Sequence, residues 1–204
     1  MLEAVITRIG LCVYNPMSIK ASRCRDSVIH NGPVPNLVAP TERVHASYLA
    51  AVADFQTQGA HIDLDIGELR DGAAFRRYVD ELIARAEPDA PRPTGYVPET
   101  VLWWVDDAAF LGRLSIRHHL TEALTRVGGH IGYEVVPAAR RRGHATTMLG
   151  AALPIASRLG IDPVLITCDR DNIASRRVIE HHGGRPDAAY ERTLRFWVPT
   201  KAVT

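Results

Sequence analysis

The chain has 204 residues, 46% of them hydrophobic, which is enough to bury one good core. Its formal net charge of +1 gives no reason to expect nucleic acid as a partner. Three widely spaced cysteines suit a reducing compartment, and no apolar run approaches the ~20 residues of a membrane span, so we expect a soluble, cytoplasmic protein with no membrane partner.

Residues 1–34 have the least regular pattern. Glu3 and Arg8 interrupt a short apolar run, which makes a poor signal peptide. Asn15-Pro16 and Asn31-Gly32-Pro33 are turn signals. We therefore expect an N-terminal extension of uncertain structure over residues 1–34 and one domain over residues 35–204.

Two amphipathic helices are predicted near the start of this domain. The first follows a short strand at Leu37-Val38, has Thr41 as a good N-cap and ends at Gly59. The second carries a buried stripe from Phe75 to Ile83 and ends before the proline-rich residues 88–93. The loop between the helices is acidic, and it either attracts an amine cation or is a solvated polar loop. Its acidic residues are Asp63, Asp65, Glu68 and Asp71.

Strand patterns follow. Residues 97–106 and 110–118 are rich in β-branched and aromatic residues and are joined by a turn, which predicts a hairpin. Residues 131–136 form a strand that is stopped by Pro137. Trp103 and Trp104 occupy adjacent strand positions, so each face of the sheet receives one ring and at least one of the two is expected in the core.

The remaining elements alternate between helix and strand. A helix is predicted from Gly143 to Gly160, a short apolar strand over residues 163–167, a helix over residues 172–182 closed by Gly183-Gly184, and a last strand over residues 194–198. Together with the earlier elements, this order predicts an α/β domain with a central mixed sheet.

The segment between the strand ending at Val136 and the next helix has the chemistry of an anion site. It reads Arg140-Arg141-Arg142-Gly143-His144-Ala145. The unpaired N–H groups of a first helical turn, together with the positive end of the helix dipole, favour a phosphate. The alternative is a solvated basic turn that caps the helix.

This segment resembles the acyl-CoA pyrophosphate loop of the GNAT (Gcn5-related) N-acetyltransferases, whose pattern is Gln/Arg-x-x-Gly-x-Gly/Ala. A second segment, Cys168 to Ser175, resembles that superfamily's Asn-x-x-Ser/Ala segment, and both occur in the expected order. The amino-acid sequence of residues 97–133 is similar to that of one branch of predicted acetyltransferases. The resemblance implies the GNAT fold, a central, mostly antiparallel sheet with helices on both faces.

The resemblance also implies a set of residues that bind acetyl-CoA as a co-substrate, without a metal. Backbone amides of the loop and the Thr146 hydroxyl would hold the pyrophosphate, Val135 and Val136 would hydrogen-bond the pantetheine arm or the thioester carbonyl, and the second segment would contact the arm. The residues are Val135, Val136, Arg140, Arg141, Arg142, Gly143, His144, Ala145, Thr146, Asn172 and Ser175.

Candidates for the group that removes a proton from the amine lie on the strand before Pro137. His130 and Glu134 have the same parity and so share a face. His130 stands where related acetyltransferases often carry a glutamate, and a histidine with a pKa near ~6.5 accepts a proton at neutral pH. Either residue could instead form hydrogen bonds within the sheet or face solvent. Trp103, Arg117 and His118 are candidates for the acceptor site.

One position departs from the family pattern. Many GNAT enzymes carry a tyrosine that can protonate the leaving thiolate, and Ile179 occupies that place. The general acid is therefore unassigned. A covalent route through Cys168 is disfavoured, because a cysteine at a strand end is more often a small buried hydrophobe.

Two hypotheses follow from these patterns. The first is an N-acetyltransferase that acts by direct attack on an amine of a small molecule, a protein lysine or an N-terminus. The second is a GNAT-fold module that binds acyl-CoA without turnover. A different acyl donor, such as succinyl-CoA, and a homodimer remain open.

Overall fold

The computed structural model describes residues 35–201, and the predicted extension over residues 1–34 lies outside the described residues. One seven-stranded sheet runs through the domain in the order β1-β2-β3-β4-β5-β7-β6. All neighbouring strands are antiparallel except β4 and β5, which are parallel. The strands are β1 (Asn36–Val38), β2 (Glu99–Asp106), β3 (Ala109–Arg117), β4 (Ile131–Val135), β5 (Val164–Asp169), β6 (Arg185–Tyr190) and β7 (Thr193–Val198).

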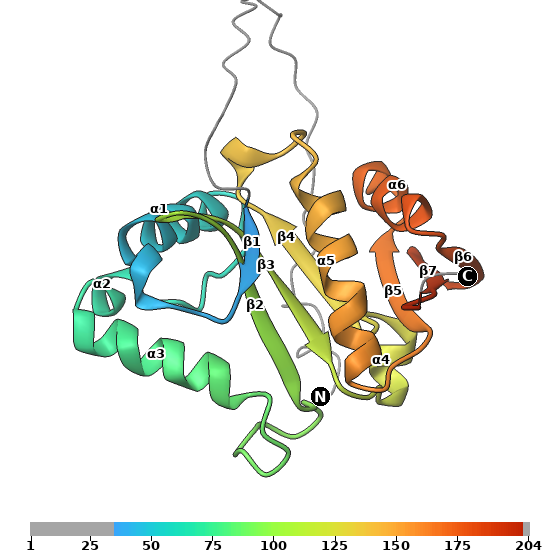
Figure 1. Ribbon diagram of the computed structural model, residues 1–204, viewed down its shortest axis with the longest axis horizontal. Coiled ribbons are helices and arrows are strands. Elements are labelled where there is room, and N and C mark those ends of the chain that lie inside the picture. Colours follow the sequence, from blue (N-terminus) through green and yellow to red (C-terminus); the bar gives the residue numbers. More distant parts are fainter. Residues whose placement is uncertain (1–34, 202–204) are drawn as a thin grey trace, which may run out of the picture.

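Helices cover both faces of this sheet (Figure 1). One group lies over β1 to β3, and the other packs across the opposite face toward β5. The first group is η2 (Glu42–Val44), α1 (His45–Gln56), α2 (Ile66–Leu69) and α3 (Gly72–Ala84); the remaining helices are α4 (Glu122–Arg126), η3 (Pro137–Ala139), α5 (His144–Arg158) and α6 (Ile173–His181).

Local sequence explains where the helices of the first group begin. The Thr41 side chain accepts a hydrogen bond from the Arg43 N–H at the start of η2. Asp65 and Asp71 accept N–H groups in the first turns of α2 and α3. Each side chain satisfies a donor that the helix leaves unpaired. Two of the four acidic residues in this loop therefore act as caps.

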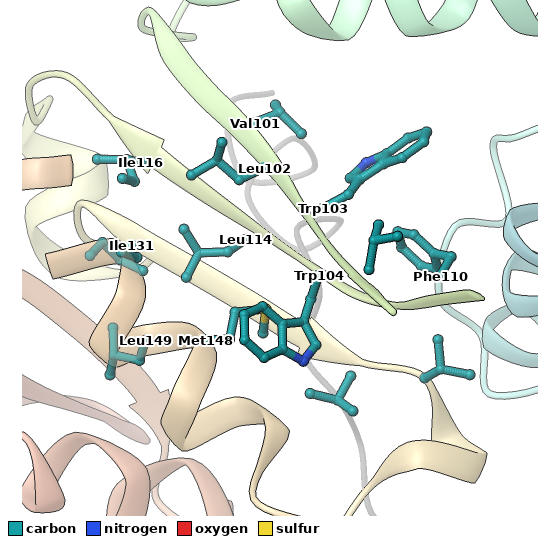
Figure 2. Close-up of a cluster of buried hydrophobic side chains, with 14 of the residues drawn as sticks. Val101, Leu102, Trp103, Trp104, Phe110, Leu114, Ile116, Ile131, Met148 and Leu149 are labelled. Atoms are coloured by element: carbon teal, nitrogen blue, oxygen red, sulfur yellow. The ribbon is translucent and has the colours of Figure 1, made fainter. Parts of the chain in front are cut away.

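Trp103 and Trp104 leave β2 on opposite sides, as strand geometry requires (Figure 2). Trp103 stacks on Tyr48 of α1 with ring centroids 4.7 Å apart, and Trp104 lies on the side of α5. Both rings are buried, at 0% and 2% exposure. The expectation that at least one is core is confirmed, and the core extends over both faces of the sheet.

The parallel strands β4 and β5 pair at a single position among the described residues, Ile131 with Ile166. Beyond it the two strands separate toward their carboxyl ends (Figure 1). The edge of β4 that faces β5 is therefore left without a partner strand from Gly132 onward. This gap lies directly before the loop that leads into α5.

The predicted α/β domain with a central mixed sheet is confirmed. Four elements were not foreseen: the four-residue α2, the five-residue α4, the 3-10 helix η3 and the edge strand β6. The β6 strand is exposed at five of its six positions and contains Pro186, so it has no alternation to detect. Within residues 35–201, no helix is both long and apolar enough to cross a membrane.

Candidate active site

The N-terminus of α5 is open. Gly143 is its N-cap residue with φ +85°, and no side chain in residues 35–201 caps this helix end. The first backbone bond back to the cap is from the Thr147 N–H to the Gly143 carbonyl at 3.1 Å. The N–H groups of His144, Ala145 and Thr146 therefore lie in the unpaired first turn, the arrangement that favours a phosphate.

Space is available at this helix end. A Cβ built on Gly143 meets no described atom within 4 Å. Arg141 is also in the left-handed region, with φ 62°. Arg141 and Arg142 are exposed, so both can add charge to a bound anion without breaking an interaction within the protein.

Arg140 is the arginine that the fold holds in place. Its Nε donates to the Val135 carbonyl at 3.0 Å, which ties the loop to the end of β4. One terminal nitrogen of the same guanidinium is buried and has no hydrogen-bond partner in the described part of the chain. A buried donor without a partner is costly. A bound anionic or carbonyl group would remove that cost.

The first residue of α5 is connected to the sheet. The Trp104 indole Nε1 donates to His144 Nδ1 at 3.1 Å. The His144 pKa is lowered, first by burial and then by Arg142. Because Nδ1 accepts from the indole, the neutral ring carries its proton on Nε2. His144 therefore holds a defined orientation beside the predicted pyrophosphate site.

Of the two backbone donors predicted for acetyl-CoA, Val135 and Val136, only one points to the open edge of β4. The Val136 N–H donates to the Leu111 carbonyl at 2.9 Å, so it is already used. Successive N–H groups of a strand point to opposite edges. The Val135 N–H therefore points toward the gap beside β5, and it is the better placed of the two predicted backbone contacts.

The two predicted contacts from the second segment already have intramolecular roles. Asn172 caps α6, accepting the Ser175 N–H at 3.0 Å. The Ser175 hydroxyl lies 2.8 Å from the Tyr133 hydroxyl, so it joins α6 to β4. Ile179, one turn further along α6, is fully buried. Tyr133 thus brings a phenol to α6, where Ile179 occupies the position at which the resemblance implies a tyrosine.

His130 is tied to the neighbouring strand. The ring Nδ1 of His130 accepts the Leu165 N–H at 2.8 Å, and the backbone N–H of His130 donates to the Leu165 carbonyl at 2.7 Å. Burial, followed by the charge of Arg117, lowers the His130 pKa to about 4. The ring is therefore neutral at physiological pH, with one nitrogen engaged in joining β4 to β5.

Glu134 lies in a charged cluster on the opposite face of β4 from Tyr133. Its Oε1 is 2.6 Å from His61 Nε2 and 3.4 Å from Arg113 Nε. The hydrogen bond from His61 and the charge of Arg113 lower the Glu134 pKa against the effect of burial. The group is thus an ionised carboxylate that is largely shielded from solvent.

The predicted acceptor-site residues lie deeper than the sequence suggests. Trp103 is fully buried, and its indole nitrogen has no partner in the described residues. Arg117 is 5% exposed and donates to the Gly128 and Gly129 carbonyls at 3.2 and 3.0 Å. His118 Nε2 is 2.9 Å from the Thr100 hydroxyl. Because Trp103 is fully buried, a direct contact between its side chain and an acceptor is not expected.

Cys168 is a buried free thiol near the end of β5. Burial raises its pKa to about 11, with a further contribution from Asp169. A thiol held in its neutral form is a poor nucleophile. The geometry agrees with the expectation that Cys168 is a small buried hydrophobe. In residues 35–201, no group of three or more His, Cys, Asp and Glu side chains is placed to hold a metal ion.

Sequence reasoning missed two residues of this region. His61 lies in the loop that we described only as acidic, 73 positions from Glu134 in the chain. Tyr133 was treated as part of a strand pattern, although strand alternation already placed it on the face opposite Glu134. The alternation could have suggested Tyr133. Nothing local could have suggested His61, because its partner is distant in sequence.

Comparison with known families and structures agrees with this geometry. Residues 39–185 match the family model described as an acetyltransferase (GNAT) domain, which is more than half of the chain. No curated protein matches the chain.

Several solved structures share the fold. Mycobacterium smegmatis RimJ, in complex with CoA-disulfide, is 19% identical with a TM-score of 0.58 over 80% of each chain. RimL, a ribosomal L7/L12 alpha-N-protein acetyltransferase, is 16% identical with a TM-score of 0.54 over 84% of this chain and 92% of its own. The putative acetyltransferase yncA from Salmonella typhimurium, with acetyl-CoA, is 14% identical with a TM-score of 0.51 over 82% and 95%. At these identities the likeness establishes the fold.

Proposed function

The chain belongs to the GNAT acetyltransferase family, and from that premise we propose that it transfers the acetyl group of acetyl-CoA to a primary amine by direct attack in a ternary complex. The main support is a single relationship: the open N-terminus of α5 and the unpaired edge of β4 lie on either side of the same short loop. This arrangement supports the proposal, because one extended ligand could reach both the helix end and the strand edge.

The residues present fit acetyl-CoA. The first-turn N–H groups of α5, the exposed Arg141 and Arg142, and the unpartnered buried nitrogen of Arg140 suit its phosphates. The Val135 N–H is directed into the gap and suits a carbonyl oxygen of the arm or of the thioester. Asn172 and Ser175 stand at the start of α6, and Ser175 contacts the Tyr133 hydroxyl of β4.

When bound, acetyl-CoA supplies a thioester, whose carbonyl carbon accepts the amine and whose sulfur departs. The protein has to hold that carbonyl, remove a proton from the amine and receive the sulfur. We assign the first task to the Val135 N–H. We assign the proton to the cluster around Glu134 rather than to His130, because His130 Nδ1 is bonded to Leu165 and its pKa is about 4.

For the departing sulfur we assign Tyr133. Its hydroxyl bonds with Ser175 on α6, one turn before Ile179, and burial raises the Tyr133 pKa so that the phenol stays protonated. A thiol has a pKa near ~8.5, so the thiolate is a fair leaving group and departs without strong assistance. The phenol therefore donates a hydrogen bond to the departing sulfur and does not have to give up its proton.

The acceptor is a primary amine of a small molecule, a protein lysine or a protein N-terminus. The name of RimL states that it acts on the α-amino group of ribosomal L7/L12. N-terminal peptides therefore belong in the first panel of acceptors, beside lysine peptides, polyamines and amino-acid derivatives.

The test is release of free thiol from acetyl-CoA by the full chain with each amine, for wild type and Gly143→Glu. Amine-dependent release that Gly143→Glu abolishes supports the transferase, and mass spectrometry of the acceptor should show one added acetyl group. Tight binding of acetyl-CoA without release by any amine would overturn this proposal in favour of a non-catalytic acyl-CoA sensor. Parallel assays with succinyl-CoA identify the acyl group.

A further inference from the structure

His61 is a histidine that the chain holds in an unusual backbone conformation. It follows α1 and has φ 53°, in the left-handed region. Gln56 of α1 fixes the loop, because its Nε2 donates to the His61 carbonyl at 3.0 Å and to the Leu64 carbonyl at 2.8 Å. Conformations of this kind cost about 1–3 kcal/mol and tend to occur where geometry serves a site.

This loop conformation directs the imidazole at β4. His61 Nε2 lies 2.6 Å from Glu134 Oε1, and the two side chains are 17% and 16% exposed. The His61 ring also packs against Phe55, with centroids 5.3 Å apart. The imidazole is thus held between an aromatic ring and a carboxylate while keeping limited access to solvent.

The partners of this pair define which ring nitrogen can accept a proton. The Glu134 pKa is lowered, so the carboxylate is ionised and can only accept hydrogen bonds. His61 Nε2 must then be the donor, and the neutral ring has its lone pair on Nδ1. No other hydrogen bond involves this ring in the described part of the chain. Nδ1 is therefore an available base.

The charged groups around the pair strengthen this division of roles. Arg113 of β3 contacts the carboxylate, and Arg140 also lowers the Glu134 pKa. Tyr48 and Tyr78, whose hydroxyls are 2.6 Å apart, complete the surroundings from α1 and α3. Two arginines make Glu134 a poor proton acceptor. It remains well suited to orient an imidazole and to stabilise the imidazolium, as in other carboxylate–histidine pairs.

We infer that His61 is the general base of the transfer, with Glu134 as its positioning residue; this rests on the proposed acetyl transfer. The neutral amine forms the N–C bond to the thioester carbonyl carbon while the C–S bond breaks. The amine proton moves to His61 Nδ1, and the thiolate of CoA leaves with a hydrogen bond from the Tyr133 hydroxyl and takes its proton from water. The imidazolium returns its proton to solvent.

The position of the pair agrees with this role. Glu134 directly precedes Val135, whose N–H points into the gap beside β5. Two residues earlier on the same face, Gly132 presents no side chain, and a Cβ there would be in van der Waals contact with Arg117 and Ser115, at 3.8 and 3.9 Å. Ile62, next to His61, is 62% exposed and available to contact an acceptor. The His61 side of the pair is thus next to a side chain that solvent reaches.

The first test measures turnover by His61→Gln, with His119→Gln as the control. Glutamine can still donate to Glu134 but cannot take a proton, so we expect kcat to fall by at least ~10²-fold while acetyl-CoA binding is retained. His119 is exposed and should tolerate the change. If His61→Gln releases thiol as fast as the wild type does, the assignment of His61 as the base is overturned and the acetyl transfer still stands. No release by wild type with any amine would overturn the transfer and the base together.

The second test does not depend on a variant that folds. Nitrogen-15 NMR of labelled histidine in the wild-type protein reports which ring nitrogen of His61 carries the proton. We expect the neutral form of the ring to carry its proton on Nε2 and none on Nδ1, with loss of this preference in Glu134→Gln. A neutral His61 with its proton on Nδ1 would overturn the inference.

Discussion

Tyr133 and Glu134 are consecutive residues of β4 whose side chains meet opposite halves of the protein. The Tyr133 hydroxyl lies 2.8 Å from Ser175 of α6, and Glu134 Oε1 lies 2.6 Å from His61 in the loop after α1. One strand therefore separates the side of the open helix end of α5 from the side of the charged cluster. In the proposed reaction, CoA departs on one side of β4 and the amine arrives on the other.

Removal of the Tyr133 hydroxyl should slow turnover more than binding. We expect Tyr133→Phe to lower kcat by about 10-fold to 10²-fold, because the departing sulfur loses its donor. Affinity for CoA, measured by calorimetry, should change little. Tyr96→Phe is the control, since Tyr96 is 43% exposed in the loop before β2. An unchanged kcat in Tyr133→Phe would remove the phenol from the mechanism.

Gly143 and Gly160 stand at opposite ends of α5, with φ +85° and +78°, and a Cβ on either meets no described atom within 4 Å. Alanine at either position should cost about 1–2 kcal/mol of folding free energy because of the left-handed backbone. Glutamate at Gly143 should in addition raise the KM for acetyl-CoA by at least ~10-fold, because its carboxylate opposes the phosphates. Gly160→Glu should leave this KM unchanged. Equal effects of the two glutamates on KM would contradict the placement of the anion site.

Trp103 and Trp104 are a matched pair, because both are buried but only Trp104 has a described partner for its indole nitrogen. Each Trp→Phe change should reduce stability through lost packing. Trp104→Phe also removes the hydrogen bond to His144, which contributes about 0.5–1.5 kcal/mol. We therefore expect a higher Kd for acetyl-CoA in Trp104→Phe alone, measured on folded protein. Identical Kd values for the two variants would show that His144 needs no support from the sheet.

His130 should make the fold sensitive to acid. Its pKa is about 4 in the folded protein, because of burial and Arg117, against an ordinary value near ~6.5. Between these values the unfolded chain binds a proton that the folded chain does not. The stability contributed by the neutral ring is therefore complete above pH ~6.5 and is lost as the pH falls toward 4.

The variant His130→Asn separates this effect from those of the other histidines. The asparagine oxygen can replace Nδ1 as acceptor for the Leu165 N–H but does not titrate. Urea unfolding at pH 7.5 and pH 5 should show a smaller loss of stability for the variant than for wild type. A loss of the same size in both proteins would show that His130 does not titrate on unfolding. Retained turnover in the variant would also separate His130 from the proton transfer.

Much of the fold followed from local sequence. The alternation in β2, β3 and β4, the cap at Thr41 and the glycine at the start of α5 are each signals that span only a few residues. Backbone preference and side-chain periodicity act over such distances, so a sequence contains them directly. The anion loop belongs to this class, because a helix N-terminus is itself the binding element.

The acid and base groups depended on the tertiary structure. His61 and Glu134 are 73 residues apart, Tyr133 and Ser175 are 42 apart, and His130 meets Leu165 across 35 residues. Sequence parity put His130 and Glu134 on one face but could not tell that the first joins two strands while the second faces an imidazole. Their roles depend on which distant segment packs against each side chain, and only the assembled sheet and its helices decide that.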